Sequence, residues 1–167
     1  FQPNQGGDYI LLTHSKLFDD GTGFNQIQDY ANYRASALGG NYTPIIVDID
    51  QVYEQFGYGI DRHEQSIRNL VQWAVKYWSS EYLFIIGKGV YYGKYRNGNA
   101  DFENYELVPS FGYPTSDNLL AAKPNTDEPV LAVGRIAAYT PDMVRIYLDK
   151  IKEVELAYQT APQTIEA

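Results

Sequence analysis

The sequence of 167 residues contains no cysteine. That absence excludes disulfide bonds, thiolate metal sites and thiol nucleophiles within the chain. The sequence also lacks an apolar run of the ~18 residues that a membrane-spanning helix needs, so we expect no membrane insertion. Its only histidines, His14 and His63, are distant in sequence and do not supply the convergent ligands of a metal site. We therefore expect no metal, no cofactor and no catalytic residue in this chain.

Positive charge is also scarce. Lys and Arg number 13 against 21 Asp and Glu, which gives a net charge of −8. A negatively charged surface repels phosphate backbones and anionic headgroups, so we expect no nucleic-acid partner. Hydrophobic residues make up 44% and charged residues 20%, as in soluble globular proteins.

The length fits one domain, which we place at residues 1–160, with 161–167 as a frayed tail or linker. The chain starts at Phe1 and shows no signal-peptide pattern. We expect it to be a piece of a longer protein that no longer carries a signal peptide.

Apolar runs without alternation predict four strands that are buried on both faces, as in parallel sheets. The four runs are Tyr9–His14, Thr43–Asp50, Tyr82–Ile86 and Pro129–Ile136. Leu107–Phe111 predicts a further short strand, and Pro109 favours an edge position for it.

Helical spacing of apolar residues predicts helices from Phe24 to Leu38, over 61–78 and over 141–158. Asp61 with Glu64 resembles a capping box at the start of the second of these helices. Thr140 is the expected N-cap of the third helix, with Pro141 at its first position.

The remaining segments are predicted to be irregular. The aromatic segment Tyr53–Tyr58 reads as a loop, residues 91–106 as a surface excursion, and Tyr113–Asp117 as a turn. The order of strands and helices predicts an α/β fold: a doubly wound, mainly parallel sheet of about four strands with helices on both faces, somewhat like a flavodoxin.

Ligands of such sheets gather outside the carboxyl ends of the strands. The polar residues expected there are His14, Asp48, Asp50, Lys88 and Arg135. Asp48 and Asp50 are two apart, and on a regular strand they would share one side. Such a pair suits acid–base work or calcium, but a strand that ends in Asp also commonly starts a turn. Both histidines are expected to be structural or solvated.

Two further patterns carry little chemistry. Gly87–Gly93 is rich in glycine but matches neither a dinucleotide-binding motif nor a P-loop. No GxSxG elbow is present, so a serine hydrolase triad lacks its signature. The sixteen tyrosines are typical of binding surfaces, although many of them lie at expected core positions.

A series of short phrases resembles the gingipain-like cysteine peptidases, peptidase family C25, which include the sortase component of type IX secretion. In chain order the phrases are Tyr9–His14, Tyr30–Arg34, Ile46–Tyr53, Phe56–Ile60, Ile67–Leu70, Tyr82–Gly87, Val108–Pro109, Tyr113–Asp117 and Leu131–Ile136. The resemblance extends from about Tyr9 to Tyr158. Lys88 and the segment 121–125 depart from the acidic residues that are usual in the family.

The resemblance implies a caspase-like arrangement of two α/β subdomains, of which this chain is similar to the first. The catalytic His and Cys of the family belong to the second subdomain, so the lack of cysteine agrees with the match. Asp117 is similar to the position whose carboxylate faces the S1 pocket in arginine-specific members. The other interpretation of Asp117 is that it caps the next turn.

The resemblance thus implies a non-catalytic N-terminal subdomain of a secreted or bacterial cell-surface cysteine endopeptidase. Its partners would be the downstream catalytic subdomain of the same protein and a peptide or protein substrate. One alternative is a stand-alone module that binds a peptide or glycan through its tyrosines. A flavodoxin-like nucleotide or flavin binder is a further alternative, which the missing phosphate loop and the net charge disfavour.

Overall fold

The computed structural model describes residues 2, 5–90 and 105–160. Its elements are β1 (Tyr9–Thr13), η1 (Ser15–Leu17), α1 (Gln26–Ala35), β2 (Pro44–Asp48), α2 (Ile49–Phe56), α3 (Glu64–Tyr77), β3 (Tyr82–Ile86), η2 (Asn118–Ala121), β4 (Ala132–Ile136) and α6 (Pro141–Thr160). The predicted excursion falls mostly on residues 91–104, and the predicted tail on 161–167, which lie outside the described residues.

The four strands form one parallel sheet in the order β2-β1-β3-β4. The predicted α/β fold with a mainly parallel sheet of about four strands is therefore confirmed. The strands are in step, because Tyr9 lies opposite both Pro44 and Tyr82, and Tyr82 opposite Ala132. Their carboxyl ends consequently meet at one edge of the sheet.

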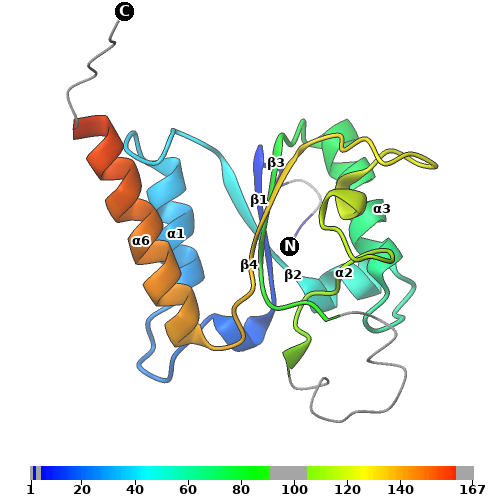
Figure 1. The fold of residues 1–167 in the computed structure, drawn as a ribbon, viewed down its shortest axis with the longest axis horizontal. Coiled ribbons are helices and arrows are strands. Elements are labelled where there is room, and N and C mark those ends of the chain that lie inside the picture. Colours follow the sequence, from blue (N-terminus) through cyan, green and yellow to red (C-terminus); the bar gives the residue numbers. More distant parts are fainter. Residues whose placement is uncertain (1, 3–4, 91–104, 161–167) are drawn as a thin grey trace, which may run out of the picture.

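Helices cover both faces of the sheet. In Figure 1, α1 and α6 lie on one side, and α2 and α3 on the other. Each face has its own apolar cluster: Leu12, Ile85 and Leu70 belong to the α2 and α3 side, whereas Leu11, Ile86 and Leu148 belong to the α1 and α6 side. Within the described helices, none is long and apolar enough to cross a membrane.

The segment after β2 is a helix, so the predicted loop at Tyr53–Tyr58 is wrong over most of its length. The strand stops at Asp48, whose carboxylate accepts a hydrogen bond from the Asp50 backbone N–H and caps α2. Ile49, Val52 and Tyr53 then bury one face of this helix. Asp48 and Asp50 therefore do not share one side of a strand.

The predicted strand at Leu107–Phe111 is also wrong. The backbone N–H groups of Leu107 and Val108 both donate to the Lys88 carbonyl, and Phe111 pairs with Ser116 in a single antiparallel bridge. These contacts hold the segment as a largely buried, irregular connection that bends at Leu107 and Val108, rather than as part of the sheet.

Some predicted helix boundaries need correction. α3 begins at Glu64 with His63 at the N-cap, so the Asp61 capping box is wrong; Arg62 between them has a positive φ of 55°. Phe24 and Leu38 lie outside α1 and are exposed. The N-cap role of Thr140 is confirmed by the bond from the Met143 N–H to Thr140 Oγ1.

The fourth strand is present, but the prediction that it is buried on both faces is wrong. β4 is an edge strand, and Ala132 and Gly134 are exposed. The central strand β1, by contrast, is buried along its whole length.

The centre of the sheet should dominate stability. We expect Leu12→Ala, at a side chain that is 0% exposed, to lower the free energy of unfolding by about 3 kcal/mol, because it removes buried methyl groups and leaves a cavity. Leu38→Ala is the matched control: Leu38 is 56% exposed, and its loss should change the free energy by less than about 0.5 kcal/mol. Equal losses in chemical denaturation would contradict the assigned core.

Candidate functional site

A small polar pocket lies at the carboxyl ends of the strands, where ligands of doubly wound sheets bind. It has a volume of about 110 Å³. Its lining residues come from the segments after β1 and β2, from the loop before α3 and from the connection before η2: His14, Lys16, Asp50, Tyr53, Asp61, Arg62, Glu106 and Leu107. We call it the carboxyl-end pocket.

Two of the five residues predicted at this end meet in the pocket. His14 Nε2 lies 4.0 Å from Asp50 Oδ2. His14 Nδ1 accepts a hydrogen bond of 3.1 Å from the Lys16 backbone N–H, so the imidazole caps the short helix η1. His14 therefore has a structural role. Asp48 has one as well, since it caps α2, and burial raises the pKa of its carboxyl.

The remaining predicted residues lie beside this pocket in separate contacts. The Lys88 ammonium lies 5.2 Å from the ring centre of Tyr105 and 5.3 Å from that of Tyr139. These distances are within the range of cation–π contacts. Arg135 binds Asp117 instead of lining the pocket.

Arg135 organises the connection between β3 and β4. Its Nε and Nη2 each donate a 2.8 Å hydrogen bond to one oxygen of Asp117, which makes a bidentate pair. Nη1 donates to the carbonyls of Gly87 and Val108, and Nη2 also donates to the Pro109 carbonyl. One guanidinium thus ties β4 to the end of β3 and to the segment that carries Glu106.

Asp117 precedes η2 and lies at the carboxyl end of the sheet, where it contacts Arg135 of β4. Its side chain makes no capping hydrogen bond, so the turn-capping interpretation is wrong. Both its oxygens accept from Arg135 instead, and its side chain is still 30% exposed. Whether this carboxylate faces a substrate stays a prediction.

Glu106 is a site residue that the sequence analysis missed. It is 5% exposed, and its buried Oε2 has no hydrogen-bond partner among the described residues. The pKa of Glu106 is raised to about 7, chiefly because the carboxyl is buried; Arg62 and Arg135 act to lower it, and Glu64 and Asp61 act to raise it. The carboxyl group can thus hold or release a proton near neutral pH. The signal that could have revealed it is its position directly before the buried pair Leu107–Val108.

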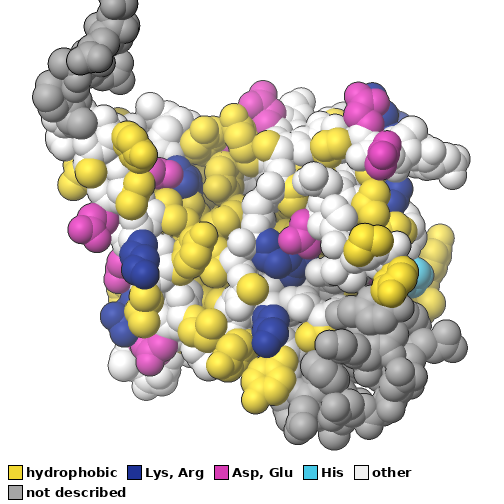
Figure 2. Space-filling model, viewed as in Figure 1, with side chains coloured by type: hydrophobic (Ala, Val, Ile, Leu, Met, Phe, Trp, Pro, Cys, Tyr) yellow, Lys and Arg dark blue, Asp and Glu magenta, His cyan; other side chains and the backbone are white. Residues whose placement is uncertain are grey.

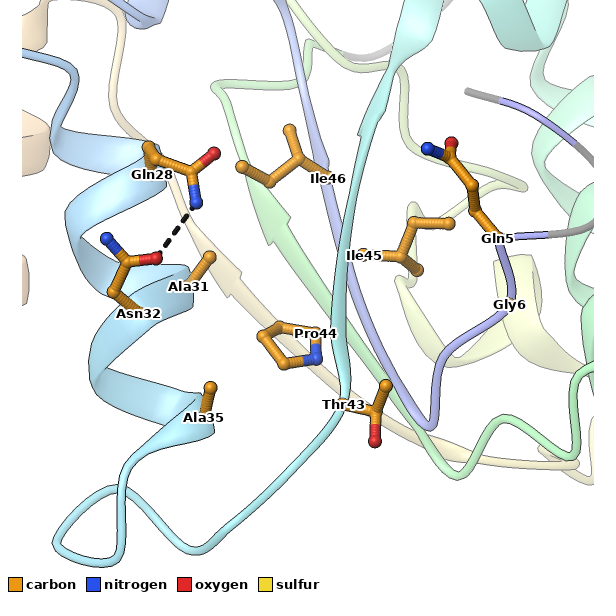
Figure 3. A pocket seen from close by; sticks show the side chains of 10 residues that line it. All are labelled: Gln5, Gly6, Gln28, Ala31, Asn32, Ala35, Thr43, Pro44, Ile45 and Ile46. Atoms are coloured by element: carbon orange, nitrogen blue, oxygen red, sulfur yellow. Dashed lines mark hydrogen bonds between the residues drawn. The ribbon is translucent and has the colours of Figure 1, made fainter.

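Within the described residues, no three His, Cys, Asp or Glu side chains converge as a metal site would require. A second, larger cavity of about 480 Å³ lies at the open edge of β2, beside α1. In Figure 3, Ile46 points toward α1 and Ile45 toward Gln5, and Gln28 donates a hydrogen bond to Asn32 on the α1 wall. None of the described residues that line this cavity has a titratable side chain, so they offer no acid–base group.

The tyrosines within residues 5–90 and 105–160 do not gather on one binding surface. Five of them form a cluster between the sheet and α1. Ring contacts join Tyr9, Tyr42 and Tyr82, a further contact joins Tyr30 and Tyr33, and Phe84 contacts both Tyr9 and Tyr30. The Arg34 guanidinium lies 5.0 Å from the centre of the Tyr30 ring and makes a bidentate pair with Glu155 of α6. This part of the tyrosine content is explained by packing.

The raised pKa of Glu106 predicts a pH-dependent stability. Between pH 4.5 and about 7 the folded chain keeps the proton that the unfolded chain releases, so the wild type loses stability as the pH rises. Glu106→Gln removes this loss. We expect the free energy of unfolding of the variant, relative to wild type, to grow by up to about 3 kcal/mol over this interval and to level off above it.

Urea titrations at a series of pH values would test this expectation. Glu54→Gln, at an exposed carboxylate on α2, controls for the loss of one negative charge. A constant difference between Glu106→Gln and wild type across the interval would contradict it.

Comparisons with known proteins agree with the observed fold. No curated protein matches significantly. A similar solved structure is that of dimeric latent PorU from Porphyromonas gingivalis, with a TM-score of 0.64 and 18% sequence identity. The match covers 86% of this chain but 15% of the PorU chain, so it shows a shared fold over a small part of a longer protein. The model of peptidase family C25 matches residues 2–165, which confirms the resemblance read from the sequence. The chain belongs to peptidase family C25.

Proposed function

We propose that this chain is the non-catalytic N-terminal subdomain of a gingipain-like cysteine endopeptidase that is secreted or held on a bacterial cell surface. It supports a catalytic subdomain farther along the same polypeptide and contributes to the pocket that receives a peptide or protein substrate. The thiolate that attacks the peptide carbonyl belongs to that second subdomain.

One observation carries the proposal: a chain that matches the C25 family model over residues 2–165 contains no cysteine. A peptidase of this class needs a thiolate nucleophile. The nucleophile therefore has to come from outside these residues. The small share of the PorU chain that the present chain covers agrees with a subdomain of a larger enzyme.

The carboxyl-end pocket supports the substrate-contact part of the proposal. It brings polar side chains to the end of the sheet where doubly wound folds bind their ligands. The unpartnered oxygen of Glu106 leaves an acceptor there, and Asp117 adds a partly exposed carboxylate. A stand-alone peptide-binding module is the alternative, favoured by the cavity at the β2 edge, because extended peptides can add to an open strand.

The isolated chain should be inactive. We expect purified residues 1–167 not to hydrolyse peptide substrates that contain Arg or Lys, whereas the full-length protein should do so in a manner that thiol alkylation abolishes. Turnover by the isolated chain that scales with its concentration and disappears on His14→Ala would refute the non-catalytic assignment. A full-length protein without activity would favour the binding module.

Asp117 allows a sharper test in the full-length protein. If its free lone pairs accept a basic substrate side chain beside Arg135, Asp117→Asn should lower kcat/KM for cleavage after Arg or Lys about 10- to 150-fold, which corresponds to about 1.5–3 kcal/mol. Cleavage after uncharged residues should change little. Asp142→Asn, at an exposed carboxylate on α6, is the control. An equal loss on every substrate would mean that Asp117 only anchors Arg135.

A further inference from the structure

α6 carries two apolar stripes, and only one of them packs on the sheet. Val144 and Leu148 are buried against it, and Ile151 is partly buried. Met143, Tyr147, Val154 and Tyr158 form the other stripe, and all four are exposed. At about 100° per residue, their spacing of four, seven and four places them on one side of the helix, roughly a quarter turn from the packed stripe.

The second stripe faces away from α1. The flank of α6 that lies next to α1 is marked by three contacts: Lys152 with Asp29, Glu155 with Arg34, and Gln159 with the Leu38 carbonyl. The second stripe lies on the opposite flank, on the side of the open edge of β4. Figure 2 shows hydrophobic side chains along α6 and in the region between α6 and the sheet.

The neighbouring edge of β4 is equally uncovered. Among the described strands β4 ends the sheet, so one side of its backbone has no strand partner there, and Ala132 and Gly134 are exposed. The run Val130–Gly134, which precedes Arg135, nevertheless has the unbroken apolar sequence that is typical of a covered strand. We call the surface formed by Ala132, Gly134 and the second stripe of α6 the edge face.

The edge face is exceptional among the described surfaces. Of the fourteen large hydrophobic side chains that are exposed in the described residues, six belong to α6, and four of these six form its second stripe. Tyr147, Ile151 and Val154 line an apolar notch of about 390 Å³ with Lys150 and Glu155 at its rim. Glu155 is already paired with Arg34, so Lys150 is the charge that this notch offers to a partner. Contiguous apolar patches of this kind mark protein interfaces.

The topology argues against covering this surface with a strand connected directly through α6. α1 and α6 lie on the same face of the sheet, and the connection through α1 runs from β1 to β2, away from β4. A right-handed connection through α6 on that face therefore leads from β4 toward β3, where the position is filled. A separately folded unit is the kind of partner that the topology allows.

We infer that the edge face is the docking surface for the second α/β unit of the same polypeptide, which presents an apolar surface with an acidic group opposite Lys150. This inference rests on the proposed function, since it takes the partner to be the catalytic subdomain. The similar PorU chain is several times longer than the matched part, as the 15% coverage shows, so a chain of that kind has further units to supply the cover.

Val154→Glu in the full-length protein tests the inference. Val154 is 52% exposed, so the charge disturbs the edge face without entering the core. Leu156→Glu is the matched control, because Leu156 is 50% exposed and lies one turn after Lys152, on the α1 flank. We expect Val154→Glu to speed amide hydrogen exchange in Ala132–Ile136 at least tenfold, and Leu156→Glu to change it less than twofold. Tyr147→Ser should repeat the effect if Val154→Glu expresses poorly.

Similar exchange rates in both variants, or rapid exchange of Ala132–Ile136 already in the wild type, would overturn the inference. If the wild type sediments as a dimer and the Val154→Glu variant as a monomer, the partner that covers the edge face is a second copy of the chain, and the inference of a second unit is overturned. Peptidase activity is measured separately. If the amides of Ala132–Ile136 exchange slowly in a full-length protein that has no peptidase activity, the proposed function is refuted but the docking surface is supported. If the full-length protein is active and these amides exchange rapidly, the docking surface is refuted but the proposed function is supported.

Discussion

The arrangement of the carboxyl end depends on one guanidinium. Arg135 sits near the end of β4 and donates to the Asp117 carboxylate and to the carbonyls of Gly87, Val108 and Pro109. These bonds replace the sheet pairing that the connection before η2 lacks, and they satisfy carbonyls that would otherwise be buried unpaired. A lysine could not make this pattern, because its single ammonium lacks the planar fork of arginine. Glu106 is held in its buried position by the segment that this network fixes.

A second charge network sets the direction of α6. Arg34 of α1 donates two hydrogen bonds to the Glu155 carboxylate of α6. The rings of Tyr9, Tyr30 and Tyr33 lie around the Arg34 guanidinium. A half-buried ion pair contributes little by itself to stability once desolvation is counted, but it is costly to break by removing one partner. The main effect of this ion pair is to fix the orientation of α6 relative to α1. It holds one flank of α6 on α1 and so leaves the opposite flank, with its apolar stripe, over the open edge of β4.

The sequence predicted secondary structure best where a single local pattern, such as an apolar run, determines the element. Tyr82–Ile86 is a strand with the predicted bounds, because an unbroken apolar run between polar segments has few other solutions. α2 was missed because the apolar run before it continues through Ile49, and the capping role of Asp48 appears only once the strand ends there. The partner of Asp117 lies 18 residues away in Arg135, a tertiary contact that no spacing rule supplies. The burial of Glu106, and hence its raised pKa, likewise depends on packing between distant segments.

The failed prediction that β4 is buried has the same origin as the inference about the edge face. An apolar run without alternation reports the environment in which a strand is stable, and that environment includes neighbours outside the described residues. The run Val130–Gly134 has the apolar sequence of a covered strand, while the position of β4 in this sheet is that of an edge. Natural sheets protect exposed edges with charges, bulges or cover. Gly134 and Ala132 offer no charge or bulk, so cover by another folded unit is the protection that remains for this edge.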